Sequence, residues 1–279
     1  YLEANGMGDG IALNDSVYTV NISGVDTLFI NTLAINDLTG IEDFSSLTYL
    51  DCSDNSLGGV DFNSNLSLST LIINNNNLTY LDVSSNVNLT GLYCSNNTLD
   101  SLNLIGAISL FDFDCSYNYI TYLDLSTNSN LSLLFCNENN LGDLDLSNNF
   151  NLSVLNCQFN NLNNLDLRPN TNLNRLDCGN NSLSSLDVRN GNNTNFIDFY
   201  TYGNNMLTCI SVDDSTYSTN TWFNIDSQSY FSNDCSLGGC IDPFYCNYNP
   251  LAIFDNGSCS GYYGCTDSTQ FNYDPLAGC

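Results

Sequence analysis

This chain of 279 residues contains no histidine and no lysine, and its basic side chains are Arg168, Arg175 and Arg189. Catalysis by a serine–histidine or cysteine–histidine pair and metal sites built on histidine are therefore excluded. With 30 acidic residues the net charge is −27, and such a surface repels nucleic acid and anionic membranes. The charge therefore predicts that the chain has no nucleic-acid partner. Long apolar runs are also missing, so we expect no membrane insertion.

Other catalytic signatures are missing too. No glycine-rich phosphate loop stands between an expected strand and an expected helix. Two carboxylates could cleave a glycosidic bond, but the acids recur at regular surface positions, where no pocket would separate their pKa values. We therefore expect a protein that is not an enzyme and needs no cofactor.

A fixed period dominates what is present. Six cysteines stand at multiples of 21 residues, with Ile73 at the one unoccupied place: Cys52, Cys94, Cys115, Cys136, Cys157 and Cys178. Three residues after each place comes an asparagine, and two residues further a leucine or isoleucine. A period of this length indicates one coil of a solenoid repeated many times.

One complete unit, residues 131–151, reads L-x-x-L-x-C-x-x-N-x-L-x-x-L-D-L-S-x-N-x-N. It resembles the leucine-rich repeat, whose signature is L-x-x-L-x-L-x-x-N-x-L. The resemblance implies a mainly β solenoid of about nine coils. Alternation around Leu134 and Cys136 predicts one strand per coil, and alternation around Leu144 and Leu146 predicts a second on the opposite wall.

The repeat divides the chain into parts. We predict an N-terminal cap (1–24), the solenoid (25–212), a C-terminal cap and linker (213–238), a cysteine-rich module (239–263) and a second, incomplete module (264–279). In the last coil Tyr200 and Tyr202 take the places of leucine and cysteine, and Asn205 takes the place of the repeat asparagine. Atypical end coils are expected, because they must cover an open core.

The thirteen cysteines form two groups. The six repeat cysteines point inward, where a reduced thiol behaves as a small apolar side chain. The other seven lie in short glycine- and asparagine-rich segments that cannot fold by apolar burial alone. There we expect disulfides and an extracellular location. The predicted pairs are Cys209–Cys235, Cys240–Cys259 and Cys246–Cys279.

The tail contains a repeat of its own, G-C-x-D…N-Y-N-P…D-x-G-S-C, which starts at residue 239 and again at residue 264. It is similar to modules found in tandem on secreted proteins of aquatic Bacteroidota. The capping phrase at residues 5–11 resembles surface repeats of the same bacteria. Both resemblances imply a secreted or cell-surface protein, and neither implies a known activity.

The outward strand positions provide a candidate binding site. An apolar group bordered by two acids is predicted on one sheet face: Tyr93, Leu133, Phe135, Val154, Asp112 and Asp114. Exposed clusters of this kind mark contacts with partners or sugars, although strand propensity alone also places such residues there. The predicted function is an adhesive or recognition scaffold for a protein or glycan. The alternative is a structural protomer that assembles head to tail with copies of itself into a filament.

Two acidic patterns could hold cations. A column of acids follows the second strand at Asp61, Asp82, Asp124, Asp145, Asp166 and Asp187. It either attracts Ca²⁺ or bonds the adjacent turns. In the tail, Ca²⁺ ligands could come from Asp242, Asn247, Asn249 and Asp255.

Four Asp-Ser or Asp-Thr triplets resemble the O-glycosylation triplet used by Bacteroidota. The resemblance implies modification of Ser16, Thr27, Ser215 and Ser268.

Overall fold

A computed structural model gives the fold of the chain. It describes residues 17–235 and 238–246, together with residues 2, 6–9, 248, 252, 254–255, 259–261, 264 and 266. Within this part of the chain no helix is long and apolar enough to cross a membrane.

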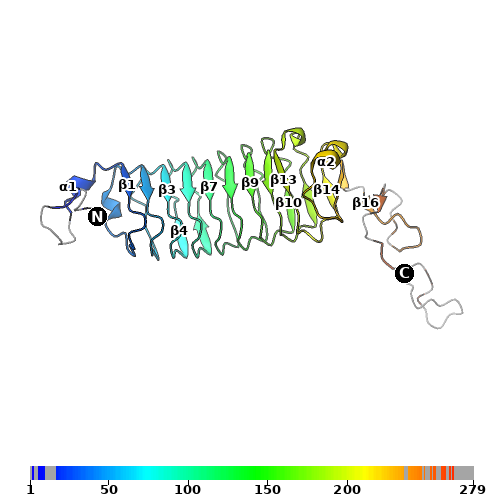
Figure 1. Cartoon of the computed structure of the whole chain (residues 1–279), viewed down its shortest axis with the longest axis horizontal. Helices are drawn as coiled ribbons and strands as arrows, with labels where there is room; N and C mark the ends of the chain where they lie inside the picture. The colour runs from blue at the N-terminus through cyan, green and yellow to red at the C-terminus, as the bar shows by residue number, and fades with distance from the viewer. Residues whose placement is uncertain are drawn as a thin grey trace.

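The chain forms an elongated parallel solenoid, with its strands stacked along the long axis (Figure 1). This confirms the mainly β solenoid expected from the repeat. One wall is a nine-stranded parallel sheet of β1 (Thr27–Phe29), β2 (Tyr49–Asp51), β3 (Thr70–Ile72), β5 (Gly91–Tyr93), β7 (Asp112–Asp114), β8 (Leu133–Phe135), β9 (Val154–Asn156), β11 (Arg175–Asp177) and β13 (Asp198–Tyr200).

The opposite wall carries the second strand of the repeat in part of the coils. Two strands pair near the N-terminal end, β4 (Tyr80–Asp82) and β6 (Ser101–Asn103). Four pair near the C-terminal end: β10 (Asn164–Asp166), β12 (Ser185–Asp187), β14 (Cys209–Ser211) and β15 (Tyr230–Ser232). Across residues 104–163, all of them described, this wall has no assigned strand. The expectation of a second strand therefore holds in part of the coils, those of β4, β6, β10, β12, β14 and β15.

Short elements complete the chain. They are α1 (Thr19–Ile22), η2 (Ile41–Asp43), η3 (Asn193–Asn195), α2 (Ser215–Thr221), β16 (Gly238–Gly239) and β17 (Phe254–Asp255).

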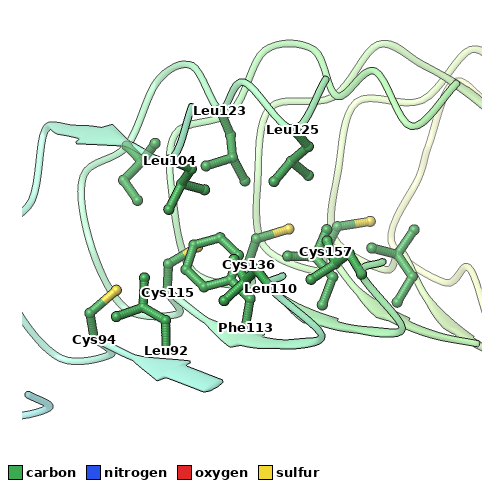
Figure 2. Close-up of a cluster of buried hydrophobic side chains, with 14 of the residues drawn as sticks. Leu92, Cys94, Leu104, Leu110, Phe113, Cys115, Leu123, Leu125, Cys136 and Cys157 are labelled. Atoms are coloured by element: carbon green, nitrogen blue, oxygen red, sulfur yellow. The ribbon is translucent and has the colours of Figure 1, made fainter. Parts of the chain in front are cut away.

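The core lies between the two walls. The six repeat cysteines are free and fully buried, in line with the prediction. Figure 2 shows Cys94, Cys115, Cys136 and Cys157 following one another along the solenoid, with Leu123 and Leu125 projecting inward from the opposite wall. Ile73 is buried at the place without a cysteine, so the position requires an apolar side chain and not a thiol.

Buried asparagines connect successive coils. The Asn139 side-chain nitrogen donates to the carbonyl oxygens of Cys115 in the preceding coil (3.0 Å) and Cys136 in its own coil (3.2 Å). Its side-chain oxygen accepts from the backbone nitrogen of Ile120 (3.0 Å), also in the preceding coil. One side chain thus satisfies main-chain groups of two coils that the core would otherwise leave unpaired. The same bonds recur at Asn76, Asn97, Asn118, Asn160 and Asn181.

A second asparagine column, for which no role was predicted, lies at the other end of the coil. Asn149 donates to the carbonyl oxygens of Leu125 (3.2 Å) and Asn128 (2.9 Å). Equivalent donors are Asn65, Asn86, Asn128 and Asn170. Among the described residues none donates to the buried side-chain oxygens of these five asparagines. This column therefore acts only through its two N–H groups.

The last coil has a different register from the one predicted. Leu176 pairs with Phe199 and Asp177 with Tyr200, so this coil begins after an insertion of two residues. Phe199 fills the leucine place and Asn204 the asparagine place, where its nitrogen donates to the carbonyl of Cys178 (3.0 Å). The prediction that Tyr200, Tyr202 and Asn205 occupy the leucine, cysteine and asparagine places was therefore wrong.

Aromatic side chains cover the C-terminal end of the core. Asp214 caps α2 by accepting from the backbone nitrogens of Thr216 and Tyr217. The helix leads into Trp222, which is buried and stacks on Phe199 with ring centroids 4.1 Å apart. The Cys209–Cys235 disulfide ties this cap to β14.

Removing one asparagine should loosen two coils at once. We expect Asn139→Ala to lower the free energy of unfolding by about 3 kcal/mol, because buried donors and acceptors lose their partners. Asn140→Ala is the matched control, since Asn140 is exposed and surface changes usually stay within roughly 0.5 kcal/mol. Urea denaturation measures both; equal losses in the two variants would contradict the role of Asn139.

The buried thiols should make stability fall in alkali. Burial raises the pKa of the Cys136 thiol to about 12, whereas an unfolded thiol ionises near pH 8.5. The buried neutral thiol makes its full contribution to the free energy of unfolding below about pH 8.5. This contribution declines by about 1.4 kcal/mol per pH unit as the pH rises toward the folded pKa. Cys136→Val should make this decline shallower by about that amount. Ile73→Val, which removes no thiol, should leave the slope unchanged. Urea denaturation between about pH 8.5 and about pH 10 tests this; equal slopes in wild type and Cys136→Val would refute it.

Candidate functional site

The residues of the predicted patch lie together on the outward face of the nine-stranded sheet. They come from four consecutive strands: Tyr93 (β5), Asp112 and Asp114 (β7), Leu133 and Phe135 (β8) and Val154 (β9). All six are half-buried, whereas the sequence analysis expected an exposed apolar patch. Strands about 4.8 Å apart bring neighbouring side chains close enough to cover one another.

Tyr93 and Asp112 form a polar contact across two strands. The Tyr93 hydroxyl donates to Asp112 Oδ2 at 2.6 Å, although the residue paired with Tyr93 in the sheet is Asp114. The ring leans over Gly91, where an added Cβ would lie 3.3 Å from Tyr93 Cε2. Partial burial, with the Asp112 hydrogen bond second, raises the pKa of Tyr93 to about 12. Tyr93 is therefore a neutral donor held in one orientation.

Asp114 has a structural role instead. Its Oδ1 accepts from the backbone nitrogen (2.9 Å) and the hydroxyl (2.6 Å) of Ser116. Asp51 makes the same two bonds to Ser53 three coils earlier. These bonds fix the turn after the strand. Asp112, by contrast, lines a hollow on the sheet face.

That hollow runs along the N-terminal ends of the strands and is termed the Tyr93 groove. It extends across five coils, from Thr70 to Asn151. Tyr93, Asp112 and Phe111 lie at its middle. The rest of its lining is formed by Thr70, Thr90, Gly91, Ser109, Asn130, Ser132 and Asn151. No basic side chain is among them.

Phe111 was missed in the sequence analysis. It stands one residue before β7, outside the strand columns used to choose the patch, and it is 50% exposed. A signal was available, because the equivalent residues of neighbouring coils are Ser69, Thr90, Ser132 and Ser153. Phe111 is thus the bulky residue in a column of hydroxyls.

The acidic column on the opposite wall bonds its own turns, as one of its two interpretations predicted. Asp145 Oδ1 accepts from the backbone nitrogen of Ser147 (2.9 Å), and hydrogen bonds from Ser147 lower the Asp145 pKa. Arg168 and Arg189 pair with Asp166 and Asp187. The same contact to the nitrogen two residues on is made by Asp61, Asp82, Asp124, Asp166 and Asp187.

The tail contains the predicted Cys240–Cys259 disulfide. Cys246 is also disulfide-bonded, but Cys279 lies outside the described residues, so that pair stays a prediction. Of the predicted Ca²⁺ ligands, Asp242 accepts from the backbone nitrogen of Phe244 (2.9 Å). Asn247, Asn249 and the side chain of Asp255 lie outside the described part. No cluster of possible metal ligands occurs among the described residues, and the Ca²⁺ site likewise stays a prediction.

The predicted glycosylation sites are placed in part. Thr27 is exposed on β1, and Ser215 is partly buried at the first position of α2. Ser16 and Ser268 lie outside the described residues. Thr27 is therefore the more accessible of the two described sites.

The fold is similar to that of several solved structures. Internalin C2 of Listeria monocytogenes is 20% identical, with 83% of this chain and 90% of that chain covered and a TM-score of 0.54. YopM of Yersinia pestis, described as a leucine-rich effector protein, is 24% identical over 67% of this chain and 50% of that chain, with a TM-score of 0.53. These two likenesses show a shared solenoid fold.

The functional domain of InlJ from Listeria monocytogenes, described as including a cysteine ladder, is 27% identical. The match covers 70% of this chain and 60% of that chain, with a TM-score of 0.43. No protein-family model and no curated protein matches the chain.

Proposed function

We propose that this chain is a secreted or cell-surface recognition scaffold that binds a protein or glycan through the outward face of its nine-stranded sheet, without catalysing a reaction. The observation that carries this proposal is the Tyr93 groove. It lies on the sheet face and combines two aromatic rings with an oriented hydroxyl–carboxylate pair. A hollow with a few fixed polar groups is the usual form of a binding site.

Location outside the cell is supported by the disulfides. Cys209–Cys235 closes the C-terminal cap and Cys240–Cys259 closes the tail module. Such bonds persist in oxidising compartments. The resemblance of the tail modules to those of secreted Bacteroidota proteins supports the same location and a bacterial host of that type.

The recognition scaffold is favoured over a filament assembled head to tail. Stacking of solenoids needs an open core at each end. At the C-terminal end Trp222, Phe199 and Phe231 are buried under the cap, and the Cys209–Cys235 bond holds that cap in place.

Negative-stain micrographs of the purified chain should therefore contain single rods; long fibres would favour the structural protomer.

Truncating the sheet face should weaken binding strongly. The double variant Tyr93→Ala with Phe135→Ala removes two rings from the face, and we expect its retention on arrays of extracellular proteins and glycans to fall at least about tenfold. Both rings are half-buried, so the thermal midpoint should also fall by a few degrees, corresponding to about 1–2 kcal/mol.

Tyr122→Ala is the matched control, because Tyr122 is 71% exposed on the opposite wall. It should bind as the wild type does. Unchanged binding by the folded double variant would mean that the outward face is not the binding surface.

A further inference from the structure

The Tyr93 groove lies where the repeat departs from its own pattern. In neighbouring coils the residue before the strand carries a hydroxyl that bonds the preceding coil: Ser69 donates to the carbonyl of Thr48 (2.9 Å) and Thr90 to that of Ser69 (3.0 Å). Phe111 interrupts this column. One coil earlier, Gly91 stands in place of a larger residue and leaves room for the Tyr93 ring. These changes gather on one stretch of an otherwise regular surface.

We propose that the Tyr93 groove binds a neutral oligosaccharide. The inference rests on the proposed recognition function and assigns its ligand class.

The aromatic groups fit the apolar faces of sugars. Phe111 is half exposed within the groove, and the ring of Tyr93 is fixed by its hydrogen bond to Asp112. Rigid rings offer a large contact area at little entropic cost. A pyranose presents one face of C–H groups, which packs against such a ring without losing the hydration of its hydroxyls.

The polar groups fit the hydroxyls of sugars. The hydroxyls of Thr70 and Ser109 have no side-chain hydrogen bond within the described part of the chain. The side-chain nitrogens of Asn130 and Asn151 donate to carbonyls of the preceding coil, which leaves each amide oxygen as an acceptor. Asp112 uses one carboxylate oxygen for Tyr93 and keeps the other. Donors and acceptors of this kind, gathered along one groove, can bond the hydroxyls of a sugar chain.

The charge of the groove restricts the class of ligand further. The net charge is −27, and the groove lining contains a carboxylate and no basic side chain. Sulfated or uronic polymers and nucleic acids would be repelled. Five coils at strand spacing make the groove roughly 19 Å long, enough for a short oligosaccharide. The lining combines two aromatic rings with six serine, threonine and asparagine residues. This mixture suits a sugar better than the larger contact of a stable protein interface, which needs roughly 800 Å² per partner.

The test compares wild type with two variants that restore the repeat pattern. Phe111→Ser introduces the residue found in the same column, and Tyr93→Ile introduces the residue of β3 at that position, Ile72. Both should fold, and circular dichroism checks this. The probes are oligosaccharides of neutral glucans, mannans, xylans and galactans, with uronic and sulfated counterparts, on a microarray followed by calorimetry. Tyr122→Ser is the control variant.

The expected result is binding to at least one neutral oligosaccharide, with affinity reduced about tenfold or more in Phe111→Ser and in Tyr93→Ile and unchanged in Tyr122→Ser. The proposal would be overturned if both groove variants bound the oligosaccharide with the affinity of the wild type. It would also be overturned if the folded wild type bound no neutral glycan. If a protein on a parallel array binds in a Phe111-dependent manner while no glycan binds, the ligand class is wrong and the recognition function stands. If neither array shows groove-dependent binding, both proposals fail.

Discussion

Each coil is joined to the coil before it by the hydrogen bonds of a buried asparagine, and the rest of the architecture follows from this contact. The residue before the asparagine takes a left-handed backbone conformation in coil after coil, for example at Asn96, Tyr117 and Phe159. For bulky residues this conformation costs roughly 1–2 kcal/mol. The turn is the same in Tyr117 and Phe159 as in Asn96, so the bonds made by the following asparagine outweigh that cost.

A turn repeated in this way determines what the remaining positions can do. Inward positions must fill a core of constant width, which leucine and cysteine do along the solenoid (Figure 2). Outward positions carry no such requirement, so Phe111 can stand where other coils have a hydroxyl. A hollow such as the Tyr93 groove can therefore arise by changing outward side chains alone, while the coils beneath keep their register.

The sequence predicts most of the fold, because its period assigns each inward residue of the regular coils. It fails where the period breaks. Both Phe199 and Tyr200 are aromatic, so the pattern alone could not show that Phe199 pairs with Leu176. The second asparagine column was visible as a repeat, but the bonds of Asn149 depend on how the turn presents carbonyls of two earlier residues.

The candidate site was predictable only in part. Columns of strand residues correctly bring Tyr93 and Asp112 to one face, yet their hydrogen bond runs diagonally between strands. That direction depends on the space above Gly91, which becomes apparent only in three dimensions. Phe111 lies before the strand, so it falls outside the columns of strand residues that indicated the site.

The central claim is that one stretch of the sheet face, and not the regular coils or the tail, contacts the ligand. Hydrogen–deuterium exchange of the intact chain, with and without a saturating neutral oligosaccharide, tests this directly. The account predicts slower exchange confined to peptides spanning residues 90–93, 109–112 and 130–132. Protection confined to the tail modules, or spread evenly along the solenoid, would contradict it.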